Sequence, residues 1–143
     1  MPKKDIRRFV LIPITREKNH HITVTASLAG RPARFLIDTG ASGTILDSEA
    51  VSHYKLKLSS TSREGTGVGA VGLRMDHVPK HDLTLSGLDL SSTKLLALDL
   101  SHVNAGLKKK KVEPVVGVIG ADVLSPRRAV IDYGRGLMLL SES

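Results

Sequence analysis

One aspartate follows directly after an apolar segment, at the start of a polar loop that contains glycine. Phe35-Leu36-Ile37 leads straight into Asp38-Thr39-Gly40-Ala41-Ser42-Gly43, so a carboxylate stands beside the expected core. A carboxylate in such a place is costly unless hydrogen bonds or a partner compensate it. Two neighbouring carboxyl groups that share one proton can hydrolyse a peptide bond, because the ionised one activates water while the protonated one donates to the carbonyl oxygen. That chemistry needs no metal and no covalent intermediate. The simpler interpretation is a polar turn between two strands.

Three strands and a short helix are expected to position this loop. Apolar residues alternate with Thr and Ser over Ile22–Leu28, which is the pattern of a half-buried strand. Turn residues at 29–32 return the chain into a second strand at Arg34–Ile37. After the loop, Thr44–Leu46 predicts another strand, and residues 47–56 predict a short helix with an aspartate cap.

The middle of the chain predicts hairpins and one loop. Gly65–Gly72 is dense in glycine yet flanked by strand-like residues, so we expect a mobile hairpin tip. The leucines of Leu83–Leu90 predict a second hairpin, and Lys94–Leu100 predicts a strand. Ser101–Pro114, which carries four consecutive lysines, is expected to be a surface loop.

The last third of the chain is again patterned as short elements. Val115–Gly120 predicts a buried strand whose glycines permit close backbone approach. Ala121–Leu124 predicts a single helical turn, and Ala129–Ile131 with Leu137–Leu140 predicts a terminal hairpin. Many short strands with one or two short helices indicate an all-β fold, either a closed barrel or a sandwich.

Three of these segments carry a family resemblance. They resemble parts of the single-lobe, retropepsin-like aspartic proteases. The active-site loop of that family is resembled by Phe35–Ser42, its flap by Gly65–Gly72, and its closing strand and helix by Val118–Leu124. Ile22–Leu140 can be laid on the plan of that family. The pattern of Gly120–Leu140 is most similar to the DNA-damage-inducible, ubiquitin-linked proteases and to bacterial retropepsin-like proteins. The resemblance implies the acid protease fold, a closed β barrel or sandwich.

The resemblance also implies a role for each residue of the loop. Asp38 would be catalytic, with active-site support from Thr39, Gly40, Ala41 and Ser42. Thr39 would bond across a pair of loops, Gly40 would turn the backbone N–H groups towards the carboxylate, and Ser42 would bond its outer oxygen. A flap would close over an extended peptide, exclude water and pair with the peptide as a strand. The substrate-binding residues of that flap would be Gly67, Val68, Gly69, Ala70 and Val71.

A shared proton requires a second carboxylate. Ile131-Asp132-Tyr133-Gly134 echoes Ile37-Asp38-Thr39-Gly40, but too few residues follow Asp132 to build a second lobe, so we interpret it as hairpin-turn chemistry. We expect the second group to be Asp38 of another copy in a two-fold homodimer. Asp122 is interpreted as a residue at a helix N-terminus. The apolar strand Leu137–Leu140 suits a dimer sheet, and it equally suits a hairpin that caps its own subunit.

The glycine-rich segment and the lysine run have alternative interpretations. Gly67, Gly69 and Gly72 have the spacing of a dinucleotide-binding fingerprint, but no βαβ unit is predicted around them. The lysine run at 108–111 favours acidic partners in general. Aromatic residues that stack on bases are nearly absent, so we do not expect nucleic acid as a partner.

The histidines raise the possibility of a metal site. His77 and His81 lie between aspartates, but Pro79 prevents one helix from aligning the two imidazoles. We expect no metal and no cofactor. His20-His21 and His53 are interpreted as surface positions.

The composition of the chain excludes chemistry that depends on cysteine and indicates a single domain. The chain has 143 residues, 21 Lys and Arg against 14 Asp and Glu, a net charge of +7 and no cysteine. It therefore has no cysteine nucleophile, thiolate metal site or disulfide. No apolar run is long enough to span a membrane or to act as a signal peptide. We expect one domain over residues 1–143 with a core at about 20–141, cytoplasmic unless a leader or anchor is missing from these residues.

The sequence thus predicts a homodimeric aspartic endopeptidase that acts on a protein or peptide substrate without a membrane. The alternative is a catalytically silent peptide-binding or assembly module on the same fold. A monomeric state in solution, or Asp38 far from any partner carboxylate, would favour that alternative.

Overall fold

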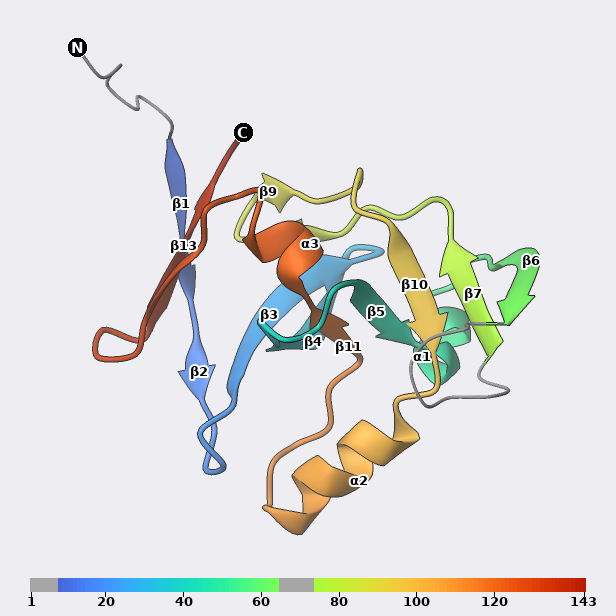
Figure 1. Ribbon diagram of the computed structural model, residues 1–143, viewed down its shortest axis with the longest axis horizontal. Helices are drawn as coiled ribbons and strands as arrows, with labels where there is room; N and C mark the ends of the chain where they lie inside the picture. The colour runs from blue at the N-terminus through green and yellow to red at the C-terminus, as the bar shows by residue number, and fades with distance from the viewer. Residues whose placement is uncertain (1–7, 65–73) are drawn as a thin grey trace.

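The structure, a computed structural model, describes residues 8–64 and 74–143 (Figure 1). Its elements are short strands and three short helices within those ranges. The strands are β1 (Phe9–Pro13), β2 (Thr15–Arg16), β3 (Ile22–Leu28), β4 (Arg31–Ile37), β5 (Thr44–Asp47), β6 (Ser59–Glu64), β7 (Arg74–Val78), β8 (Thr84–Leu85), β9 (Leu88–Asp89), β10 (Leu95–Leu98), β11 (Gly117–Ile119), β12 (Val130–Asp132) and β13 (Leu137–Ser141). The helices are α1 (Ser48–His53), α2 (Ser101–Lys109) and α3 (Ala121–Leu124).

Most strands join one curled sheet in the order β6-β7-β10-β5-β11-β4-β3-β8-β9, with β2 also paired to β3. Strand β11 is parallel to β4 and antiparallel to β5. It therefore lies between the two strands that flank the Asp38 loop, although it is far from them in the sequence. The predicted all-β fold with few short helices is confirmed.

Two tight hairpins form where turn residues predict them. Strands β3 and β4 pair over their whole length, and Ala29 and Gly30 between them have positive φ angles of 52° and 72°. Ser86 and Gly87, at 48° and 83°, connect β8 to β9 in the same way. Two consecutive left-handed residues give a turn whose twist matches that of the strands it joins.

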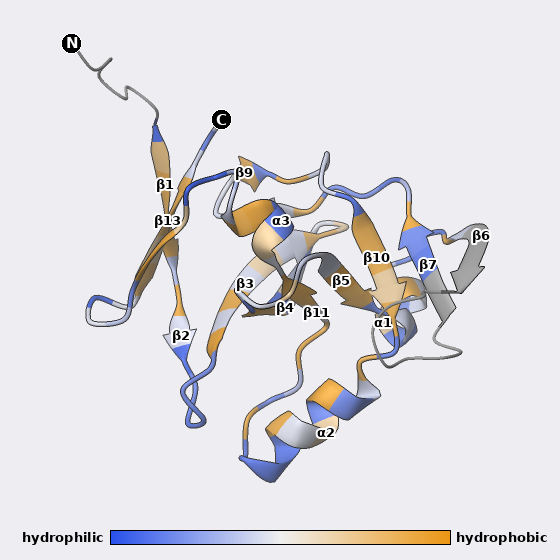
Figure 2. Cartoon of the chain, in the orientation of Figure 1, coloured by the Kyte–Doolittle hydropathy of each residue, from blue (hydrophilic) through white to orange (hydrophobic). Residues whose placement is uncertain are grey.

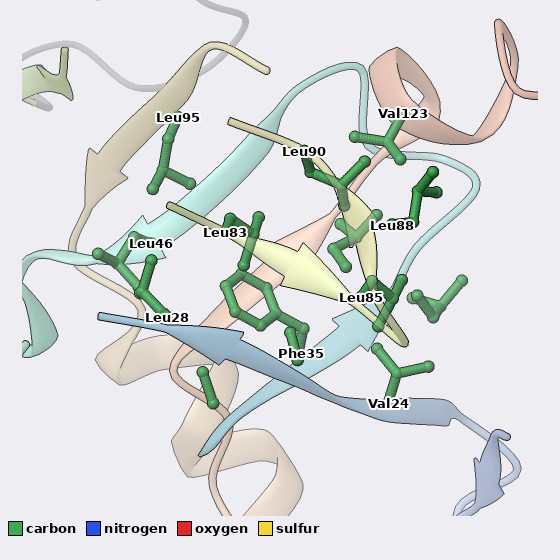
Figure 3. Packing of buried hydrophobic residues seen from close by; sticks show 14 of the residues in the cluster. Val24, Leu28, Phe35, Leu46, Leu83, Leu85, Leu88, Leu90, Leu95 and Val123 are labelled. Atoms are coloured by element: carbon green, nitrogen blue, oxygen red, sulfur yellow. The ribbon is translucent and has the colours of Figure 1, made fainter. Parts of the chain in front are cut away.

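The core is aliphatic and is built around one aromatic ring. Phe35 is fully buried, and Figure 3 shows leucines from β3, β5 and the β8–β9 hairpin around it. Side chains alternate across a strand, so Phe35 and Ile37 face this core while Leu36 faces the opposite side of the sheet. A Cβ on Gly117 would lie 2.3 Å from the Phe35 ring, so β11 passes beneath that ring only because it has glycine there.

Helix α2 forms where a loop was expected. Its Leu107 is buried in a second cluster on the far side of the sheet, and its Asn104 amide makes two hydrogen bonds of 2.8 and 3.0 Å with the Val115 backbone. Figure 2 shows hydrophilic and hydrophobic residues alternating along α2. The loop prediction for 101–114 was wrong because this helix is stabilised by contacts with distant strands. The second cluster consists of Leu36, Leu100, Leu107, Val112, Val115 and Val118.

The two ends of the chain form a separate sheet in the order β1-β13-β12. Strand β13 pairs with β1 on one edge and with β12 on the other, so both of its edges are occupied within the chain. Met138 faces the core and is fully buried, whereas Leu11 and Val130, on the other face, are 55% and 50% exposed. Within the chain β13 therefore has a partner on each edge, and β12 presents a free edge within the described part of the chain.

Candidate active site

The loop that follows β4 continues the strand and is tied to β11. The N–H of Asp38 donates to the carbonyl of Ile119 at 3.0 Å, and the N–H of Ala41 donates to the carbonyl of Asp38 at 3.2 Å. The N–H of Gly40 donates to Oδ1 of Asp38 at 2.9 Å, which is the kind of contact that the tight turn was expected to provide. A Cβ on Gly40 would lie 3.3 Å from the same oxygen. A side chain at position 40 would therefore crowd this carboxylate oxygen, and glycine avoids that contact.

Gly120, between β11 and α3, lets these elements pack closely against the loop. A Cβ there would lie 2.5 Å from the carbonyl oxygen of Gly43 and 2.6 Å from that of Ala41. The φ of −107° and ψ of −171° at Gly120 are accessible to other residues, so space rather than backbone conformation requires glycine. The N–H of Ala121 donates to the carbonyl of Ala41 at 2.7 Å and holds the two segments together.

Asp122 holds the far end of the same loop. Its carboxylate accepts hydrogen bonds from the N–H and the hydroxyl of Thr44, at 3.1 and 2.7 Å. Thr44 is fully buried, and its hydroxyl oxygen accepts from the N–H of Gly120 at 3.2 Å. Asp122 does lie in the first turn of α3, as the sequence indicated. Its link to Thr44 was missed because the two residues are 78 positions apart.

The predicted support residues take different positions around Asp38. Thr39 and Ser42 are exposed, and in the described part of the chain Ser42 makes no hydrogen bond with the Asp38 carboxylate. Ala41 packs against the second cluster and so links the loop to α2. The predicted flap residues 67–71 lie outside the described residues. The strands on either side of them, β6 and β7, pair antiparallel, as expected of a hairpin.

Asp38 lines a cavity of about 210 Å³ beside the terminal sheet. It is the only carboxylate among the described residues that line this cavity, so one chain brings one catalytic candidate to it. Two larger cavities, of about 710 and 740 Å³, are lined by no residue of the loop, whereas a cavity of about 300 Å³ shares Thr39 and Ile131 with the Asp38 cavity. The residues that line the Asp38 cavity are His20, His21, Ile22, Leu36, Ile37, Asp38, Thr39, Ile131 and Tyr133.

Asp132 belongs to a hairpin turn, as its sequence context indicates. Its carboxylate accepts from the guanidinium of Arg135 at 2.8 Å and from the Arg135 N–H at 2.9 Å. These hydrogen bonds lower the pKa of Asp132 below its ordinary value. The resemblance of Asp132-Tyr133-Gly134 to the Asp38 loop therefore reflects turn chemistry, and the second half-site within one chain is not formed.

The histidines that could suggest a metal site are used otherwise. Both ring nitrogens of His81 lie close to backbone partners, the carbonyl of Thr93 at 2.7 Å and the N–H of Leu83 at 3.3 Å. Residues 8–64 and 74–143 contain no group of three or more His, Cys, Asp or Glu side chains placed to hold a metal ion. Within the same ranges no helix is both long and apolar enough to cross a membrane.

Comparisons with known proteins agree with this geometry. The family model described as "Aspartyl protease" matches residues 24–123, a span that contains the Asp38 loop, β11 and most of α3. The chain therefore belongs to the aspartyl protease family that this model describes. No curated protein matches the chain.

Solved structures of retropepsin-like and retroviral proteases share the fold of this chain at low sequence identity. A retropepsin-like aspartic protease from Rickettsia conorii has a TM-score of 0.62 at 16% identity, over 98% of this chain and 97% of that one. The retroviral protease-like domain of Ddi1 from Leishmania major has a TM-score of 0.56 at 13% identity, over 82% and 86%. The EIAV protease, solved with the inhibitor HBY-793, has a TM-score of 0.51 at 19% identity, over 92% and 98%.

Proposed function

We propose that this retropepsin-like chain is an aspartic endopeptidase that works as a homodimer. Asp38 from each of two copies binds one water molecule. The ionised carboxyl removes a proton from the water while the protonated carboxyl donates to the carbonyl oxygen of the peptide bond. Two carboxyls that share one proton are the known catalytic arrangement of aspartic proteases, and we propose the same arrangement for this chain. An extended peptide would lie under the segment 67–71.

The observation on which this proposal rests is a carboxylate that is held in place but has no second described carboxylate beside it in the cavity. Backbone hydrogen bonds fix Asp38 from both sides, yet no other described carboxylate lines its cavity. A two-fold axis beside the cavity would supply the same group from the partner. The free edge of β12 supports this arrangement, because Ile131 and the adjacent Tyr133 line the cavity with Asp38.

A comparison of two aspartate variants tests the activity. We expect Asp38→Asn to lower the cleavage of a peptide library by at least about a hundredfold between acidic and neutral pH, since it removes the acid–base group. Asp99→Asn is the matched control, because it makes the same chemical change at an exposed aspartate that does not line the Asp38 cavity, and it should retain activity. Equal activity of Asp38→Asn and the wild type would exclude the peptidase, and the peptide-binding module would then be the better description.

A mixing experiment tests the dimer. Inactive Asp38→Asn chains added in excess to wild-type chains should form mixed pairs and reduce the cleavage rate. Light scattering at several concentrations measures the mass of the assembly independently. Full activity by a species with the mass of one chain would contradict the shared dyad.

A further inference from the structure

We propose that His20 and His21 select the substrate by binding an acidic side chain next to the peptide bond at Asp38. This inference rests on the proposed endopeptidase function and adds to it a substrate class. Both residues were expected to be ordinary surface positions. In the structure they line the same 210 Å³ cavity as Asp38.

The turn that carries the two histidines is held by its own backbone. The N–H of Glu17 donates to the carbonyl of His21 at 2.8 Å, and the N–H of His20 donates to the carbonyl of Glu17 at 2.9 Å. The N–H of His21 donates to the side-chain oxygen of Asn19 at 3.1 Å. Three hydrogen bonds within so short a segment fix the direction in which the imidazoles leave the backbone.

His20 lies in the left-handed region, which histidine, asparagine and aspartate adopt more readily than most other side-chain-bearing residues. Its φ is 71°, in the left-handed region where glycine or asparagine is more easily accommodated. Ala29 and Ser86 adopt the same conformation in the two hairpin turns, so at His20 it defines a tight turn that places the two histidines.

The acidic residue nearest in sequence does not compete for the imidazoles. One carboxylate oxygen of Glu17 accepts from the Thr23 hydroxyl and from the Arg34 guanidinium, each at 2.7 Å. That guanidinium forms an ion pair with it in a mostly buried setting. The charge of Glu17 is therefore already paired with Arg34, and Glu17 does not line the cavity.

The remaining groups of the cavity suit a glutamate side chain. The titratable residues that face the histidines there are Asp38, on the loop after β4, and Tyr133, on the turn after β12. An imidazole gains positive charge between about pH 8 and pH 5. Ile22 and Ile37, which are buried on the same face of the sheet, contribute apolar lining for a methylene stem. The volume is below the roughly 300–1,000 Å³ of whole-ligand sites, so it suits one side chain.

Paired peptides that differ only in Glu or Gln test the inference. Each position on both sides of the scissile bond is substituted in turn, and kcat/KM is measured from pH 5 to pH 8. At one position we expect the wild type to prefer Glu by about three- to tenfold at pH 5, a preference that declines towards pH 8. The double variant His20→Asn/His21→Gln should lose it, and asparagine is chosen because it tolerates the left-handed turn.

Two further variants separate charge recognition from a merely structural role. His102→Gln, which changes an exposed histidine on α2 away from the cavity, should retain the preference. His21→Arg keeps a positive charge at all these pH values, so its preference for Glu should persist at pH 8. Unchanged preference in the double variant, or an equal loss in His102→Gln, would overturn the assignment.

Binding to the Asp38→Asn protein distinguishes failure of this inference from failure of the proposed function. The dissociation constants of the Glu and Gln peptides are compared by calorimetry at pH 5. Cleavage without any Glu preference would overturn the role of the histidines and leave the peptidase intact. Tighter binding of the Glu peptide by a wild type that cleaves nothing would retain their recognition role and remove the peptidase. Equal binding of both peptides, or of neither, would overturn the inference.

Discussion

Replacing Gly120 by alanine should damage catalysis more than stability. The new Cβ would lie 2.5 and 2.6 Å from two carbonyl oxygens of the Asp38 loop, whereas ordinary contacts begin near 3.4 Å, so the loop must withdraw by close to 1 Å. Overpacking of this kind costs about 1–3 kcal/mol in the free energy of unfolding. For a chain of this size that corresponds to a fall in Tm of roughly 4–12 °C. A displacement of about 1 Å at a catalytic group can cost a hundredfold in rate.

The matched control is Gly106→Ala, because a Cβ at that position in helix α2 meets no atom within 4 Å. Alanine is favoured over glycine inside a helix by about 0.5–1 kcal/mol, so this variant should be slightly more stable and equally active. Calorimetry gives Tm, and peptide cleavage at 25 °C gives kcat on folded protein. A large fall in Tm with unchanged kcat for Gly120→Ala would refute the claim that this glycine positions Asp38.

Two further predictions concern carboxylates outside the dyad. Asp122→Ala should lower the free energy of unfolding, measured in urea, by about 1.5–3 kcal/mol, because the buried Thr44 loses its charged acceptor. A free energy of unfolding within about 0.5 kcal/mol of wild type would contradict a stabilising role for the Asp122–Thr44 hydrogen bonds. Asp132, whose folded-state pKa is lowered by its hydrogen bonds to Arg135, should contribute stability above the unfolded-state pKa of about 4 and lose it as pH falls. Asp132→Asn should therefore flatten the decline in stability between pH 6 and pH 3, and an unaltered pH dependence would exclude this contribution.

Local patterns were sufficient to predict the strands and turns around Asp38. The alternation over Ile22–Leu28 and the Ala29-Gly30 pair act within a few residues, so the β3–β4 hairpin can be inferred without tertiary information. The same holds for the short helix after Gly120, where a glycine and a following helical turn are adjacent in the sequence. These local elements carry most of the evidence for the fold.

Features that depend on distant contacts could not be predicted in this way. Helix α2 is stabilised by the burial of Leu107 against other strands and by the hydrogen bonds of Asn104 to Val115, none of which appears in a periodicity plot. The same limit applies to His20-His21, because only the folded chain brings that turn to the cavity of Asp38. The pair of adjacent histidines in a polar segment before β3 is the local signal that could have drawn attention to it.

The exposure of Asp38 explains how a costly charge can follow three buried residues. In the single chain the carboxylate emerges at the surface and accepts one backbone N–H, so folding does not need to compensate a buried charge. Two carboxyls acquire different proton affinities only when they approach each other. Under the proposed mechanism that approach occurs at assembly, when the partner brings its own Asp38 to the edge of the cavity. The pH dependence of cleavage should therefore report on the paired state, whereas the pH dependence of unfolding reports on groups such as Asp132 that complete their hydrogen bonds within one chain.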